Sequence, residues 1–131
     1  LEYLVIEDWK AAGLEALDAQ SGGIQARELR SDELERRYGK AGGLRQSARG
    51  DFALQGSAGF TGRERYVWRE LRDSHAAYFF DRLPQGVWEL RTSLRAEALG
   101  RYHWLPARGG AMYVPEIRAQ GCEVRLTVGE R

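Results

Sequence analysis

Apolar and polar positions alternate along much of the second half of the chain, which is the pattern of strands that bury one face. Between residues 87 and 96, apolar or small side chains occupy every second position: Trp88, Leu90, Thr92, Leu94 and Ala96. Successive side chains of a strand point to opposite faces, so these five would share one buried face. Two further runs rich in aromatic residues, at 66–72 and 76–83, come before it, and turn-forming residues separate the three runs. The pattern predicts a three-stranded antiparallel meander.

Shorter runs predict the remaining strands. Residues 1–7 form a continuous apolar run that predicts a strand buried on both faces, and residues 14–17 extend it after a bend. Residues 101–105 predict a strand with Tyr102 and Trp104 on one face, and the alternation of the last strand places Cys122 inward. A sheet with one apolar face needs a second layer to cover it, so the predicted fold is mainly β, an antiparallel β-sandwich.

Residues 18–65 differ from the rest of the chain, and we call them the insert. They contain 9 of the chain's 16 glycines and little strand periodicity. A compact domain rarely carries so long a loop without structure of its own, which makes the insert a candidate for function. Within it, residues 28–38 predict one short helix, with Asp32 and Glu35 as a capping box, and residues 45–62 are predicted to be the most mobile part. At 131 residues, we expect a single domain over 1–131 that carries this insert.

Charge and cysteine content exclude several classes of function. Twenty basic against 19 acidic side chains give a net charge of +1, so no overall field favours nucleic acid or an anionic membrane surface. No apolar run approaches the roughly 20 residues that cross a bilayer. The single cysteine cannot form an internal disulfide. Because a predicted strand begins at the first residue, without a signal-like segment, we expect a domain of a longer polypeptide.

No combination of residues predicts a catalytic, cofactor or metal site. His75 and His103 are the only histidines and have no partners at metal-ligand spacing, so both are interpreted as surface residues. Cys122 is interpreted as a buried, inert thiol, and the carboxylates as parts of solvated faces. The Gly-rich run at 56–62 lacks the Lys and Ser or Thr of a phosphate-binding loop. The four tryptophans are either core residues or a platform on which sugars stack, and the alternation favours the core.

The most distinctive exposed candidate is an interaction loop with an apolar tip, Met112, Tyr113, Val114 and Pro115. It lies in a Gly-rich, Pro-flanked segment, residues 106–117, which is predicted to be a loop. A flexible thioether next to an amphipathic ring is common where a loop covers a partner surface, although the same pair can fold back on its own core. Both interpretations stay open on the sequence.

The order of several motifs resembles a known family. The motifs are Tyr-Leu-Val-Ile-Glu-Asp from residue 3, Ala-Gly-Leu-Glu-Ala-Leu from residue 12, Glu-Leu-Arg-Asp-Ser-His from residue 70, Phe-Phe-Asp-Arg-Leu-Pro-Gln-Gly from residue 79, Leu-Arg-Ala at 94–96 with Leu-Gly-Arg at 99–101, and Leu-Pro-Ala-Arg-Gly-Gly-Ala-Met-Tyr-Val-Pro-Glu-Ile from residue 105. In this order they resemble the C-terminal macroglobulin-like (MG10) domain of bacterial alpha-2-macroglobulins. The insert is only loosely matched.

The resemblance implies a non-catalytic β-sandwich domain of a large periplasmic protease inhibitor or trap, anchored to the inner membrane as a lipoprotein and serving bacterial defence. Its partners would be neighbouring domains of the same chain and, through the full-length protein, proteases; direct membrane contact is not expected. In members with an internal thioester a Met-Tyr pair shields that bond, and Met112 and Tyr113 match the pair. Cys122 is not in a thioester motif. The surrounding Gly-Gly-Ala-Met-Tyr-Val-Pro sequence favours the thioester-lacking MagD type.

Two functions of other classes remain as alternatives. The first is a carbohydrate-binding β-sandwich module that uses exposed tryptophan and tyrosine rings. The second is a hydrolase, for which the sequence offers no nucleophile and base to nominate.

Overall fold

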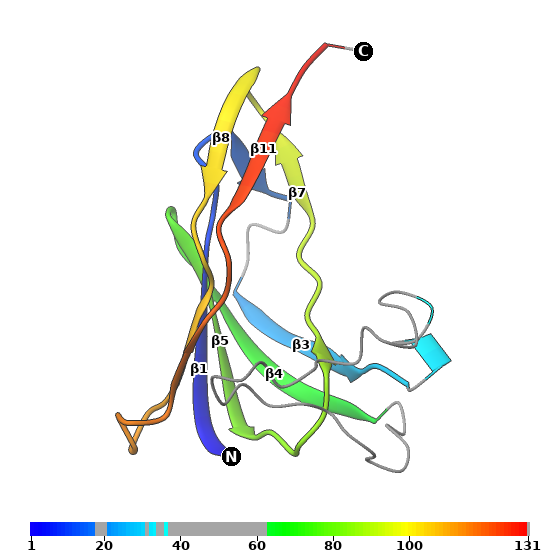
Figure 1. Ribbon diagram of the computed structural model, residues 1–131, viewed down its shortest axis with the longest axis vertical. Helices are drawn as coiled ribbons and strands as arrows, with labels where there is room; N and C mark the ends of the chain where they lie inside the picture. Colours follow the sequence, from blue (N-terminus) through cyan, green and yellow to red (C-terminus); the bar gives the residue numbers. More distant parts are fainter. Residues whose placement is uncertain (18–20, 31, 34–35, 37–62, 131) are drawn as a thin grey trace, which may run out of the picture. The chain divides into compact units, whose positions relative to one another are not determined.

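The fold of the chain is mainly β, as predicted. A computed structural model describes residues 1–17, 21–30, 32–33, 36 and 63–130 (Figure 1). These residues are arranged in antiparallel sheets, which confirms the predicted sandwich class. They fall into two compact units: unit 1 comprises Leu1–Gln25, Tyr66–Pro84 and Arg91–Arg131, and unit 2 comprises Ala26–Arg65 and Gln85–Leu90. In the described part of the chain, no helix is long and apolar enough to cross a membrane.

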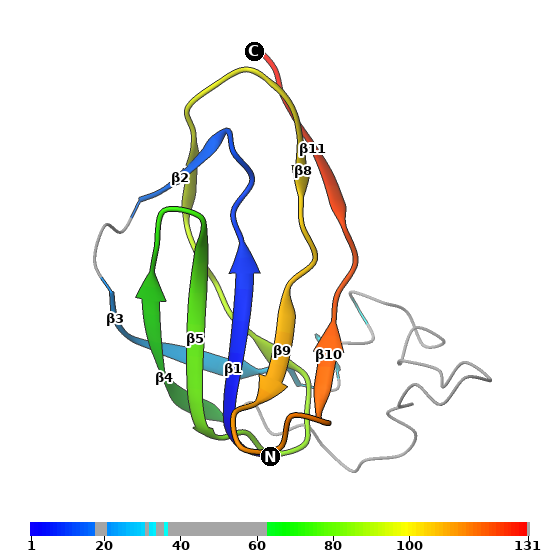
Figure 2. The same ribbon diagram turned by 90° about the vertical axis from the view of Figure 1, so that its left-hand side faces the viewer.

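The large sheet has the strand order β10-β9-β1-β5-β4-β3-β6, where β6 is Trp88–Glu89. Most of it belongs to unit 1, and the end of β3, the start of β4 and β6 belong to unit 2. The strands are β1 (Glu2–Trp9), β3 (Gly22–Glu28), β4 (Glu64–Leu71), β5 (His75–Arg82), β9 (Arg108–Ala111) and β10 (Arg118–Gln120). The first predicted strand is therefore central, because β1 lies between β5 and β9 and pairs with both (Figure 2).

Two small sheets complete unit 1. One pairs β2 (Leu14–Ala16) with β7 (Leu94–Ala96), and the other pairs β8 (Gly100–Trp104) with β11 (Val124–Val128). Tyr102 and Trp104 of β8 are half-buried and the intervening His103 is exposed, which confirms the alternation predicted for this strand. The N-terminus and the β9–β10 loop lie at one end of unit 1, and β8 and β11 at the other (Figures 1 and 2).

The core of unit 1 contains rows of residues that face one another on neighbouring strands of the large sheet. Leu4 faces Phe80 on β5 and Ala111 on β9, and all three are buried. The next row places Ile6 between Tyr78 and Gly109. Apolar residues two positions apart on β1 thus fall on one face, as strand geometry requires. On β1, Leu4 is buried and residues 5–9 are half-buried, whereas Glu2 and Tyr3 are exposed. The strand predicted to be buried on both faces is therefore only partly covered.

In unit 2 the end of β3 pairs with β6 (Trp88–Glu89), and Arg27 lies opposite Glu89. Its most buried polar group is Glu28, which is 1% exposed. The Arg63 guanidinium donates hydrogen bonds to both carboxylate oxygens of Glu28, at 2.9 and 3.0 Å, and lies 6.0 Å from the ring centre of Trp88. Burial of a carboxylate is costly unless it is paired in this way.

The predicted meander is correct in its first two strands and wrong in its third. Residues 66–71 and 75–82 form the β4–β5 hairpin. The third run forms two short strands instead of one, because β6 pairs with β3 and β7 pairs with β2. Thr92 and Leu94 are half-buried between exposed neighbours, so the predicted alternation of burial holds over residues 91–95. It fails on either side, because Glu89 is half-buried like Trp88 and Leu90, and Ala96 is exposed.

Three expectations about single residues or segments were also wrong. Cys122 is exposed, since it precedes the start of β11, whose first residue, Val124, is 55% exposed as well. His75 is half-buried at the start of β5, and its ring stacks on Trp9 with centroids 4.7 Å apart. Glu28 is buried and paired, not part of a solvated helix.

The insert is described only at its two ends. Residues 22–28 form strand β3, which the scarcity of strand periodicity in the insert did not predict. Asp32, Glu33 and Arg36 are helical, but Glu28 belongs to β3 and Leu29 and Arg30 are not helical, so the helix was predicted to begin too early. Residues 31, 34–35, 37–38 and 45–62 lie outside the described part of the chain. Glu33 accepts hydrogen bonds from the Arg30 backbone and the Arg27 side chain, which lower the pKa of its carboxyl.

Candidate functional site

The four residues of the predicted interaction loop lie together in the connection between β9 and β10. Gly110 of β9 pairs with Arg118 of β10, and the Ala111 amide donates to the Ile117 carbonyl at 3.0 Å, which closes the connection at its base. Both strands belong to the large sheet of unit 1. The loop is therefore carried by paired strands at the end of a sheet, an arrangement that fixes a binding loop on a rigid support.

A tight turn forms the outer part of this loop. The Ile117 amide donates to the Val114 carbonyl at 3.0 Å, so residues 114–117 form a β-turn with Pro115 in its second position. Proline is favoured there because its ring presets the φ angle that the turn needs. The Arg118 guanidinium also donates to the Pro115 carbonyl. The turn is held by its own hydrogen bonds rather than by burial of its side chains.

Tyr3 holds the first two residues of the loop. Its carbonyl accepts a hydrogen bond from the Met112 amide at 2.7 Å. Its ring meets the Tyr113 ring edge to face, with centroids 5.2 Å apart and an angle of 79° between the planes. This geometry is favourable for aromatic pairs. The central strand of the sheet thus contacts both residues of the Met-Tyr pair.

The side chains of this loop form an exposed apolar surface, which we call the apolar tip and define as Tyr3, Met112, Tyr113, Val114 and Ile117. Tyr113 is 74% exposed, Met112 51% and Tyr3 47%. Single exposed apolar residues are common on protein surfaces, but several apolar residues at one hydrogen-bonded loop indicate a contact surface. Of the two interpretations that the sequence left open, the exposure agrees with a loop that faces outward rather than one folded onto its own core.

A charged pair lies next to the apolar tip on β1 and β5. Glu2 and Arg82 face each other across the two strands, and the guanidinium donates to the carboxylate at 2.6 Å. This hydrogen bond, followed by the positive charge of Arg82, lowers the pKa of Glu2. The carboxylate therefore stays ionised at neutral pH, and the apolar tip adjoins a neutralised pair.

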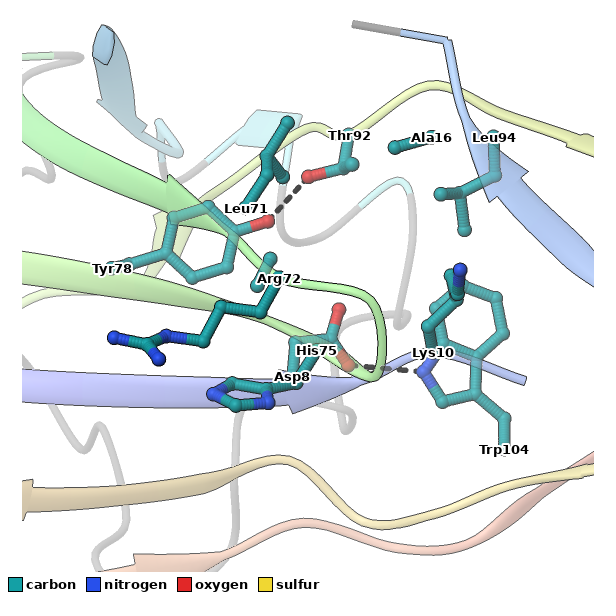
Figure 3. Close-up of a pocket in the computed structure, with 11 residues that line it drawn as sticks. Asp8, Lys10, Ala16, Leu71, Arg72, His75, Tyr78, Thr92, Leu94 and Trp104 are labelled. Atoms are coloured by element: carbon teal, nitrogen blue, oxygen red, sulfur yellow. Dashed lines mark hydrogen bonds between the residues drawn. The ribbon is translucent and has the colours of Figure 1, made fainter. Parts of the chain in front are cut away.

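A small pocket elsewhere in unit 1 is a second candidate (Figure 3). It is lined by Asp8, His75, Tyr78, Thr92 and Trp104, among others. The indole of Trp104 donates to the Asp8 carboxylate at 3.0 Å, and the Tyr78 hydroxyl is hydrogen-bonded to Thr92, so these groups satisfy one another. A volume of about 30 Å³ accommodates one or two water molecules rather than a ligand. We therefore interpret the pocket as part of the packing of unit 1.

The other residues considered for chemistry are not brought together. The described residues contain no group of three His, Cys, Asp or Glu side chains that could hold a metal ion. His103 is exposed, and its Nδ1 atom pairs with Glu123, the residue before β11. Cys122 is a free, exposed cysteine.

Two features of the site were missed in the sequence. Tyr3 was interpreted as part of a buried strand, and Ile117 was not among the residues predicted for the interaction loop. The continuous apolar run at the start of the chain concealed Tyr3, because such a run gives no sign of which residues lie outside the core. The same motif order that placed Met112 next to Tyr113 also contained Tyr3 and Ile117, at its two ends.

Comparison with known proteins gives one match. The model of the bacterial alpha-2-macroglobulin MG10 domain family matches residues 1–116, which include all of the apolar tip except Ile117. No curated protein and no solved structure matches the chain.

Proposed function

Because the chain belongs to the bacterial alpha-2-macroglobulin MG10 domain family, we propose that it is a non-catalytic domain of a periplasmic protease inhibitor that docks onto neighbouring domains through Met112–Pro115. The observation that supports the proposal is the exposure of Met112 and Tyr113 in a loop that backbone hydrogen bonds hold in place. A pre-positioned apolar loop loses little conformational freedom on binding, which favours association.

The proposed partner is another domain of the same alpha-2-macroglobulin-like chain. Its contact surface would be apolar, because the tip offers a thioether, a phenol ring and two aliphatic side chains. If the parent chain carries an internal thioester, Met112 and Tyr113 would exclude water from that bond. If the parent is of the thioester-lacking MagD type, the same residues would serve as a domain contact alone. The protease-trap role and the inner-membrane anchor are then properties of the parent protein.

The test uses the full-length parent protein with the double substitution Met112→Ala and Tyr113→Ala. Central interface residues typically contribute more than about 1 kcal/mol each, so docking should weaken by roughly 10- to 100-fold. Hydrogen-deuterium exchange of residues 112–117 measures docking, and residual activity of an incubated protease towards a large protein substrate measures inhibition. The matched control is Leu99→Ala with Val124→Ala, which removes two equally exposed apolar side chains from the other end of unit 1.

The expected result is fast exchange at the loop and weakened inhibition in the Met112 and Tyr113 variant, with both quantities unchanged in the control. An unchanged protease response together with unchanged exchange in the double variant would contradict the docking role. Equal effects of both variants would indicate general destabilisation instead.

One observation favours the carbohydrate-binding alternative as a second candidate. Tyr66 and Trp68 stand two positions apart on β4, and they are 61% and 47% exposed. Residues two apart on a strand share a face, so the two rings form a small aromatic platform in unit 1. Tryptophan fluorescence titrated with a panel of glycans tests this function: a saturable response that Trp68→Ala abolishes would support it, and a flat response removes it.

A further inference from the structure

The backbone of Tyr3 has a conformation that tyrosine rarely adopts. Its φ angle is +51°, and in the described part of the chain it is the one non-glycine residue with positive φ. In this region the Cβ atom crowds the neighbouring carbonyl, so a residue with a large side chain is disfavoured there unless its surroundings impose the conformation. Such outliers are frequently found where a side chain has to be aimed at a functional site.

The pairing of β1 shows what this conformation does. Along β5 the register passes from Glu2 opposite Arg82 to Leu4 opposite Phe80, and along β9 it begins with Leu4 opposite Ala111. Tyr3 belongs to neither set of paired positions: it interrupts the β5 ladder between Glu2 and Leu4, and it lies just beyond the end of the β9 ladder. Its carbonyl accepts a hydrogen bond from the Met112 amide instead, at 2.7 Å.

The side chain of Tyr3 is directed to the same loop. Its ring meets the Tyr113 ring edge to face at a centroid distance of 5.2 Å, and both rings are exposed. One residue therefore fixes the backbone of Met112 through its carbonyl and the ring of Tyr113 through its own ring. Because neither ring enters the core of unit 1, burial inside the domain does not account for the arrangement.

We propose that Tyr3 is a positioning residue, which holds Met112 and Tyr113 in the orientation that docks onto the neighbouring domain. The inference rests on the proposed docking function and adds a residue from the opposite end of the sequence to that surface. Tyr3 also contributes its own exposed ring edge to the apolar contact. Preorganisation of this kind reduces the freedom that the loop loses on binding.

Three substitutions separate the ring of Tyr3 from its backbone. Tyr3→Phe keeps the ring and the steric demand of the positive φ angle. Tyr3→Ala removes the ring and keeps a Cβ atom in the crowded position. Tyr3→Gly removes the ring and relieves the crowding, because glycine adopts positive φ without steric cost. Tyr66→Ala is the matched control, since it removes another exposed tyrosine ring, two strands away in the sheet order.

The experiment measures docking in the full-length parent protein, by hydrogen-deuterium exchange of residues 112–117, and Tm in the 131-residue chain. We expect Tyr3→Ala and Tyr3→Gly to speed exchange at the loop by about tenfold alike, the size typical of a lost interface contact, and Tyr3→Phe to restore slow exchange. The Tm should be higher for Tyr3→Gly than for Tyr3→Ala. Tyr66→Ala should leave exchange at the loop unchanged.

This pattern distinguishes positioning from a structural role. If Tyr3 acted only on the fold, docking would follow Tm, and the glycine variant would dock better than the alanine variant; that result would overturn the inference. Combining Tyr3→Ala with Tyr113→Ala should have less effect than the sum of the two, because both remove the same ring contact. Additive effects would also contradict it.

The same data separate this inference from the proposed function. If Met112→Ala with Tyr113→Ala leaves exchange and inhibition unchanged, the docking function fails. If that variant undocks while Tyr3→Ala and Tyr3→Gly dock like the unmodified protein, the docking function stands and the role of Tyr3 is wrong.

Discussion

Two tyrosines at opposite ends of unit 1, Tyr102 and Tyr113, are held in different ways. The ring of Tyr102 lies against the backbone of Gly13, where an added Cβ atom would come within 2.3 Å of it, and its hydroxyl donates to the carbonyls of Ala98 and Leu99 at 3.1 Å. Tyr113 is 74% exposed and touches the ring of Tyr3. The Tyr102 ring packs against the chain, whereas the Tyr113 ring is exposed to solvent. The difference identifies Tyr102 as part of the fold and Tyr113 as part of a surface.

The largest expected effect comes from truncating the two rings in turn. Tyr102→Ala should lower the free energy of unfolding by about 2–4 kcal/mol, because it removes a packed ring and leaves a cavity beside Gly13. Tyr113→Ala should change it by no more than about 0.5 kcal/mol, as is usual for exposed residues. Urea unfolding of the 131-residue chain measures both. Similar losses for the two variants would mean that the contrast between the two ends does not exist.

A second substitution tests how closely Gly13 and Tyr102 are packed. Gly13→Ala places a Cβ atom within 2.3 Å of the Tyr102 ring, so the ring or the backbone has to shift, and the change should cost about 1–3 kcal/mol of unfolding free energy. In the background of Tyr102→Ala the same change should cost much less, since the clash is gone. An equal cost in both backgrounds would place the effect in the backbone of Gly13 rather than in the ring.

A third tyrosine, Tyr78, should make the unfolding free energy depend on pH. Burial raises the pKa of its hydroxyl, against a smaller opposing effect of the hydrogen bond with Thr92. In the unfolded chain a tyrosine loses its proton near pH 10. Above that pH the unfolded state binds fewer protons than the folded state, so unfolding free energy should fall, by at most about 1.4 kcal/mol per pH unit. Below about pH 10 this contribution is fully present.

Unfolding measured between pH 8 and 11.5 checks this expectation against Tyr78→Phe. The phenylalanine variant has no hydroxyl to titrate at this position, so its stability should decline less steeply with pH. Parallel curves for the two proteins would show that Tyr78 does not contribute to alkaline unfolding.

The local sequence pattern predicted where strands occur better than it predicted which strands pair with each other. The β4–β5 hairpin followed from two apolar runs around a short turn, which are all local features. The third run after Pro84 was different, because Trp88 pairs with Glu28 and Leu94 with Ala16, residues far away in the sequence. Alternation indicates which face of a strand is buried, and it does not indicate which strand pairs with it.

Buried charge was the second kind of feature that the sequence did not predict. Glu28 lies in a charged stretch that is compatible with a helix, and its partner Arg63 is 35 positions further on. No local rule connects the two. The pairing depends on the two ends of the insert meeting, which only the tertiary structure determines.

The candidate site was predicted in part, and the reason is again local. The loop at 106–117 was predicted too long, because Gly109 and Gly110 lie in paired strand β9. Met112 and Tyr113 were still recognisable, because a Gly-rich, Pro-flanked segment predicts an exposed loop. Tyr3 was not, since a positive φ angle at tyrosine has no sequence signature. Strained residues imposed by long-range contacts are therefore the part of a site that sequence patterns identify least well.

The closure of unit 2 by Glu28 and Arg63 has a consequence for how this domain can vary. The amide of Glu28 donates to the Arg63 carbonyl at 2.8 Å, so the two residues form a latch at which the chain leaves the sheet and returns to it. Whatever joins them meets the same two anchored ends, and doubling its length costs only about 0.6 kcal/mol of closure entropy. We therefore expect related domains to vary in length at this point more readily than within the paired strands.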